Sequence, residues 1–117
     1  MPKSLFLFIN LSDHQVCWGN CRLALSKRFY QLYCRLAVAR LKSVAVDKGF
    51  VDLEEIARLP LWGKNTLMSV GKQINRHIAK MRNAGIALIE GQQKVKGPFR
   101  LGVLPAQIRL DMPIEKL

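Results

Sequence analysis

The sequence predicts a single domain of mixed α+β class, with a small sheet, three helices and a closing hairpin. Three observations support this prediction: apolar residues recur at helical spacing in two long segments, short aromatic and β-branched runs flank them, and glycine or proline separates the segments. The chain has 117 residues, half of them hydrophobic, so it can bury a core without disulfides or metal. We expect one domain over residues 1–110 and a tail or linker over 111–117.

The first quarter of the chain predicts a small antiparallel sheet. Aromatic and β-branched residues favour strands at 5–9 and 15–18. Gly19 supplies a turn, from which residues 21–25 can return as a third strand.

The first long helix begins after Ser26, whose hydroxyl can accept a hydrogen bond from the first turn. It is expected to close at Lys48-Gly49, with glycine just past the helix end. Its core-facing residues recur at helical spacing: Phe29, Leu32, Tyr33, Leu36, Ala37 and Val44.

A short helix is expected at 53–59, capped by Asp52 and stopped by Pro60. Glu54 and Glu55 lie in its first turn, where the helix dipole favours negative charge. This placement explains three of the chain's eight acids without assigning them catalytic roles.

A third helix is expected over 66–84, capped by Thr66 and ended by Gly85. One stripe of this helix is apolar, with Val70, Ile74, Ile78 and Met81. The opposite side is basic and carries amides, with Lys72, Arg76, Ala79 and Asn83 flanked by Asn75 and Lys80.

The remaining sequence predicts a strand at 86–89, a turn at 90–93, and a hairpin of 94–96 with 99–103, bent at 97–98. Strands, helix, short helix, turn, basic helix and basic hairpin follow one another. That order predicts a winged helix-turn-helix, in which the third helix enters a groove of DNA and the hairpin is the wing.

Charge points to a polyanionic partner. The chain has 19 Lys and Arg against 8 Asp and Glu, a formal net charge of +11. Eight of these cations and only one acid, Glu90, lie between Lys64 and Arg100. We therefore expect the basic third helix and hairpin to bind nucleic acid.

Five segments resemble the OmpR/PhoB-type effector domains of bacterial regulators. They are VCWGNCRLAL (16–25), FYQLYCRL (29–36), LWG (61–63), RHIAKMR (76–82) and KVKGPFRL (94–101). The last two are similar to the family's recognition helix and wing, and the likeness covers about residues 4–103. The resemblance implies duplex DNA binding in transcription regulation, and a contact of the loop 60–65 with RNA polymerase.

The sequence also departs from the family's pattern. The wing is one residue shorter, Asn75 stands where an acid is common, and Ala79 stands where a cation is common. A base preference is therefore not implied. No receiver domain with a phosphoacceptor Asp is present in this chain, so phosphorelay control is not implied either.

The candidate DNA contacts divide by chemistry. Arg76 can bind a guanine edge in two places, and Asn75, with Asn83 or Gln73, can pair with adenine. Lys72 and Lys80 suit phosphates, as do Thr66 and Ser69 near the helix N-terminus. The wing would place Lys94, Lys96 or Arg100 along an adjacent groove, with Phe99 and Leu101 in the core.

Other chemistry has weak support in the sequence. The three cysteines do not form a paired C-x-x-C, and His14 and His77 are far apart, so we expect reduced thiols, no metal and no cofactor. His77 is expected to be packed and Trp62 to anchor its loop.

Motifs of hydrolases, phosphate loops and zinc proteases are absent, so we expect a binding protein rather than an enzyme. No apolar run is long enough to span a membrane, and the N-terminus lacks a signal-peptide pattern, which favours the cytoplasm.

We expect sequence-specific binding of duplex DNA by a dimer or a tandem of modules. Three alternative functions are also compatible with a winged helix. A winged helix can be a protein-interaction adaptor in a larger assembly, which requires an exposed apolar patch. It can also bind RNA, which requires exposed aromatic residues for stacking, whereas the aromatics here mostly follow core periodicity. A membrane-surface role requires a wide apolar face on a basic helix, and the apolar stripe of the third helix is narrow.

Overall fold

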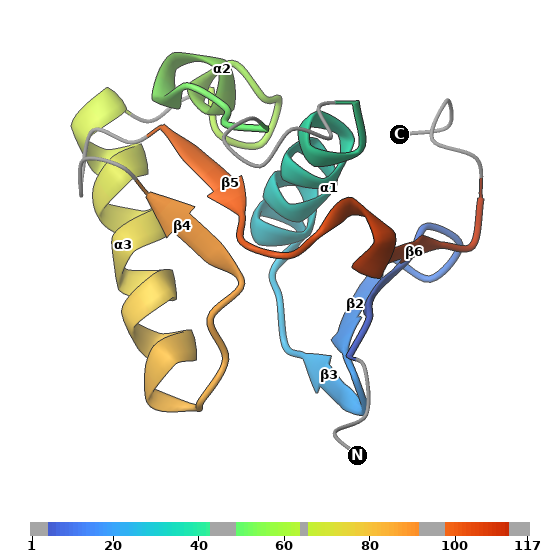
Figure 1. The fold of residues 1–117 in the computed structure, drawn as a ribbon. Helices are drawn as coiled ribbons and strands as arrows, with labels where there is room; N and C mark the ends of the chain where they lie inside the picture. Colours follow the sequence, from blue (N-terminus) through green and yellow to red (C-terminus); the bar gives the residue numbers. More distant parts are fainter. Residues whose placement is uncertain (1–4, 43–48, 64–65, 92–97, 113–117) are drawn as a thin grey trace.

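The first helix lies between two separate sheets, and the third helix lies at the edge of the molecule beyond the smaller sheet (Figure 1). The computed structural model describes residues 5–42, 49–63, 66–91 and 98–112. Among them are three α-helices, a four-stranded sheet and a two-stranded sheet, and Figure 1 shows α3 and the four-stranded sheet at opposite ends of the molecule. The predicted mixed α+β class is confirmed.

The four-stranded sheet has the order β3-β2-β1-β6. Its strands are β1 (Leu7–Asn10), β2 (Gln15–Trp18), β3 (Cys21–Leu23) and β6 (Ile108–Leu110). The three N-terminal strands pair antiparallel, as predicted. β1 begins two residues later than expected, and β3 ends two residues earlier because the chain then turns toward the first helix.

Strand β6 was not predicted, and it closes the sheet by pairing parallel with β1. Asp111 follows it and accepts hydrogen bonds from the backbone N–H of Leu11 (2.6 Å) and Ser12 (3.2 Å) and from the Ser12 hydroxyl (2.8 Å). These bonds, led by that from Leu11, hold the pKa of the Asp111 carboxyl below its usual value. Asp111, placed by the sequence at the start of the tail, therefore belongs to the folded part.

Helix α1 (Lys27–Lys42) begins as predicted, with the Ser26 hydroxyl accepting from the backbone N–H of Phe29 at 3.4 Å. Its core side is fully buried at Leu32, Tyr33, Leu36 and Ala37. The predicted continuation over 43–48 lies outside the described residues.

Helices α2 and α3 follow the predicted order. α2 (Leu53–Ala57) is shorter than expected, and the Asp52 side chain makes no capping hydrogen bond; its backbone carbonyl accepts from Glu55 and Ile56 instead. α3 (Leu67–Asn83) is capped as predicted, because the Thr66 hydroxyl accepts from the Ser69 N–H at 3.1 Å.

The C-terminal hairpin pairs β4 (Ile89–Gly91) with β5 (Phe99–Leu101). The turn predicted at 90–93 is therefore wrong for Glu90 and Gly91, which are strand residues. A polar side chain and a glycine suggested a turn, but Glu90 lies on the exposed side of β4, opposite Arg100. The strand predicted at 94–96 lies outside the described residues. Phe99 and Leu101 are fully buried, as predicted.

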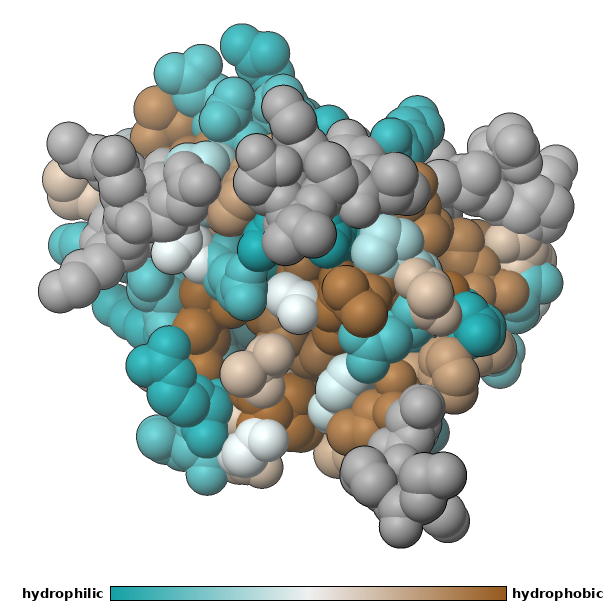
Figure 2. Space-filling view, viewed as in Figure 1, coloured by the Kyte–Doolittle hydropathy of each residue, from teal (hydrophilic) through white to brown (hydrophobic). Residues whose placement is uncertain are grey.

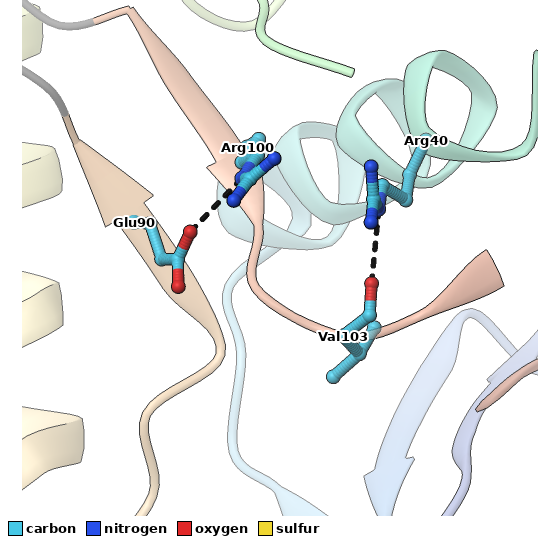
Figure 3. Close-up of polar contacts among 4 residues, drawn as sticks. All are labelled: Arg40, Glu90, Arg100 and Val103. Atoms are coloured by element: carbon cyan, nitrogen blue, oxygen red, sulfur yellow. Dashed lines mark hydrogen bonds and ion pairs between the residues drawn. The ribbon is translucent and has the colours of Figure 1, made fainter. Parts of the chain in front are cut away.

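One cation is buried in the described part of the fold. Arg40, only 3% exposed, donates from Nε to the carbonyl of Val103 at 3.0 Å (Figure 3). This bond ties α1 to the segment between β5 and β6. Gly49 packs against the same side chain, and an added Cβ there would lie 3.0 Å from Arg40 Cδ.

We predict that Arg40→Met lowers the free energy of unfolding by about 1–3 kcal/mol, because the buried Val103 carbonyl loses this donor. Arg35→Met is the control: Arg35 forms a half-exposed ion pair with Glu55 at 2.7 Å, and its loss should cost less than about 1 kcal/mol. Urea unfolding measures both. Equal losses in the two variants would contradict the structural role of Arg40.

Candidate nucleic-acid interface

The outward side of α3 carries a row of polar residues. Lys72, Arg76, Lys80 and Asn83 are all exposed and lie three or four residues apart, so they share one face. No acid occurs anywhere in α3. In Figure 2 the left edge of the molecule, where α3 lies, is lined largely by hydrophilic residues. The predicted basic face is thus on the surface.

The N-terminal half of this face is slightly hollowed. The hollow has a volume of about 290 Å³, and its lining includes five of the predicted contact residues: Thr66, Ser69, Lys72, Gln73 and Arg76. The structure therefore brings the predicted phosphate and base contacts of this half of the helix together.

Two of the predicted base-reading amides are bonded within the protein. The Gln73 carbonyl oxygen accepts from Arg28 Nη1 at 2.6 Å, and its Nε2 donates to the Ser69 hydroxyl at 3.1 Å. Asn75 Nδ2 donates to the Gly71 carbonyl one turn earlier, at 2.8 Å. Asn75 also lines a groove between α3 and β4 rather than the exposed row. These amides support the helix, in contrast to the exposed Asn83.

Arg28 is a residue of this region that the sequence did not single out. Besides Gln73, it binds the Leu61 carbonyl through Nε at 3.1 Å, and its Cζ lies 5.1 Å from the centre of the Trp62 ring. Trp62 is fully buried and donates from Nε1 to the Arg28 carbonyl at 3.0 Å, so it anchors its loop as predicted. The link between Arg28 and Gln73 spans 45 residues, and no local pattern could indicate it.

His77 is packed, as predicted. Its Nε2 lies 2.7 Å from the Tyr33 hydroxyl, in hydrogen-bonding contact, and its ring stacks on Phe29 with centres 4.5 Å apart. Burial, and secondarily the charge of Lys80, lowers the pKa of His77. The neutral form of His77 therefore holds α3 against α1.

The hairpin uses one predicted wing cation for its own stability. Arg100 Nε pairs with Glu90 Oε2 at 2.9 Å (Figure 3). The guanidinium also lies over the Phe50 ring, with its Cζ 4.7 Å from the ring centre. Arg100 is thus held against the hairpin, where the sequence predicted a groove contact. Lys94 and Lys96 lie outside the described residues.

Other chemistry finds little support in the described part of the chain. Its three cysteines form no disulfide, and burial raises the pKa of the Cys34 thiol. Over the described ranges, no group of three metal-binding side chains gathers in one place. No described helix combines the length and apolar character needed to cross a membrane.

No protein-family model, curated protein or solved structure matches this chain. The likeness to OmpR/PhoB-type domains therefore rests on the sequence motifs. What the geometry adds is an exposed basic face on α3, an opposite face that packs against the core, and a hairpin beside the helix (Figure 1). Residues of β4 and α3 line a common groove.

We predict that the free energy of unfolding falls as the pH drops from about 7.5 to about 5.5. The folded-state pKa of His77 lies below its unfolded value of about 6.5. The unfolded chain therefore binds the proton first, and stability is lost on acidification through this window. Urea unfolding of wild type and His77→Gln at three pH values measures this effect, and the variant should show a smaller loss. The same pH dependence in both proteins would be inconsistent with this role for His77.

Proposed function

We propose that this chain is a winged helix-turn-helix module that binds duplex DNA sequence-specifically. The observation that carries the proposal is the acid-free α3, whose apolar stripe packs against the core and whose Lys72, Arg76, Lys80 and Asn83 face outward. An α-helix fits the major groove, where each base pair presents its own pattern of donors and acceptors.

Each exposed residue suits one kind of contact. Arg76 is at the middle of the row and can donate two hydrogen bonds to a guanine edge. Lys72 and Lys80 flank it at one turn on either side and suit phosphates, which set the register of the helix. The β4–β5 hairpin is the proposed wing, and the sequence joining its strands contains Lys94 and Lys96.

The bonded amides lead us to revise the proposed readers. Gln73 and Asn75 already make short hydrogen bonds within the protein. Each bond holds its side chain against the protein, so a base contact that turns either amide toward DNA would break that bond and lower the net gain from binding. We therefore assign base reading to Arg76 and Asn83, and support of the helix to Gln73 and Asn75.

The wider role follows from this binding mode and from the family resemblance. We propose a non-enzymatic transcription regulator of the bacterial type, working in the cytoplasm as a dimer or tandem, since one helix covers few base pairs. The loop 60–65, in which Leu61 is exposed, is the proposed contact with RNA polymerase.

A second candidate is a protein-interaction adaptor, favoured by one cleft. Leu53, Leu67, Met68 and Pro98 line it with Asp52, Glu54 and Lys72, in a volume of about 690 Å³. Met68 is 63% exposed. These apolar groups suit a protein partner, although beside a DNA-binding face they also suit thymine methyl groups.

The test measures affinity for labelled random duplex DNA at roughly 50 and 200 mM salt by fluorescence anisotropy. Wild-type affinity should fall steeply with salt, and Lys72→Ala and Arg76→Ala should each weaken binding, with the salt slope of Lys72→Ala reduced by about one. Lys42→Ala is the charge-matched control, because Lys42 is exposed at the C-terminal end of α1, outside α3 and the hairpin.

If wild type fails to bind duplex at low salt, the adaptor replaces DNA binding as the proposed function. If Lys42→Ala weakens binding as much as the α3 variants, the α3 face is not the contact surface.

A further inference from the structure

The outer face of the four-stranded sheet carries exposed aromatic and basic residues. Alternate strand residues point inward, where Leu7, Ile9, Val16, Leu23 and Ile108 join the buried core. The positions that alternate with them share the opposite, outward face: Phe6, Phe8, Asn10, Gln15, Cys17, Arg22 and Arg109. Phe6 precedes β1 but continues the pairing, because its carbonyl accepts from the Gly19 N–H at 3.0 Å.

Strand register aligns four of these residues across the sheet. Phe8 pairs with Cys17 on one side and Arg109 on the other, and Cys17 pairs with Arg22. Neighbouring strands lie about 4.8 Å apart, so the row spans roughly 14 Å. The row thus carries the phenyl ring of a central strand and one guanidinium from each of the two edge strands.

Arg109 is already fixed in a stacking geometry. Its Cζ lies 4.4 Å from the centre of the Phe6 ring, and its Nη1 donates to the Ala106 carbonyl at 2.6 Å. A guanidinium over a phenyl ring presents a flat cation to solvent, on which a further planar group can stack.

Exposure and charge favour a planar, anionic ligand. Phe6 and Phe8 are each 38% exposed, in contrast to the fully buried Phe99. No acid occupies an outward position in the four strands of this sheet. The nearest acids along the chain, Asp13 and Asp111, lie in or beside the β1–β2 turn and bond to it.

We propose that this outer sheet face binds single-stranded nucleic acid. Bases stack on Phe8 and on the layered Phe6 and Arg109, while Arg22 binds phosphate at the other edge. Gln15, which pairs with Asn10 in the strand register, supplies an amide beside the rings for base edges, whereas the Asn10 amide is bonded to Asp13. Most aromatics were expected to follow core periodicity, and Phe6 and Phe8 are exposed exceptions, on a sheet remote from α3 (Figure 1).

This proposal is independent of duplex binding by α3. Labelled oligo(dT) and oligo(rU) of about 12 nucleotides are titrated separately, with and without saturating unlabelled duplex, by anisotropy. Their relative affinities distinguish DNA from RNA as the source of the strand. We expect wild type to bind at least one of them and to keep binding it when duplex is in excess.

Phe8→Leu and Phe8→Trp form the decisive pair. Leucine keeps an apolar side chain but removes the aromatic face, so single-strand affinity should fall about 5- to 150-fold. Tryptophan keeps the face, so affinity should persist and the added emission, relative to wild type, should be quenched on binding. Arg76→Ala should leave single-strand affinity unchanged.

A second variant tests the proposal even if substitution of Phe8 destabilises the fold. Arg22→Ala should reduce the salt slope of single-strand binding by about 0.7, the value for one phosphate contact. Absence of binding by both oligonucleotides, unchanged affinity in folded Phe8→Leu, or complete displacement by duplex would each overturn the proposal. Loss of duplex binding alone would overturn only the function proposed for α3.

Discussion

The placement of α3, which packs on α2 and is linked to α1 through side chains, is the constraint on which the rest of the structure depends. Val70 and Ile74 are fully buried on the inner side of α3. Two polar links, His77 to Tyr33 at 2.7 Å and Gln73 to Arg28 at 2.6 Å, fix the rotation of the helix about its axis. Because side chains project from a helix at set angles, this rotation also decides which residues face solvent. The basic row is outside because the apolar stripe and the two links are inside.

Helix α1 and the segment bonded to it separate the two proposed binding surfaces. α1 is buried along one side, and its Arg40 holds the segment that leads from the hairpin to β6. β6 completes the sheet beside β1, and the four-stranded sheet and α3 lie at opposite ends of the molecule (Figure 1). A chain with a net charge of +11 can therefore present two cationic surfaces without bringing them close together.

Local patterns in the sequence predicted the helices well. Helical spacing identified the buried sides of α1 and α3, and the Thr66 cap was correct, because these signals lie within a few residues. Contacts between distant segments were not predictable: β6 pairs with β1 across about a hundred residues, and Arg28 meets Gln73 from another helix.

Two surface features were missed for related reasons. Glu90 and the glycine after it suggest a turn in the sequence, and the ion pair of Glu90 with Arg100 becomes visible only once the hairpin register is known. The run at 5–9 is apolar throughout, so no alternation marks Phe8 as outward-facing, and only the register of three strands does so.

The central claim is that burial of one side of α3 leaves its other side to enter duplex DNA. The most direct test is a titration of the isotope-labelled protein with a short duplex, followed by amide and arginine Nε chemical shifts. The account predicts shifts concentrated at Lys72, Arg76 and Lys80, with the β1–β2 sheet unchanged. Shifts confined to the sheet, or none on α3 at saturation, would contradict it.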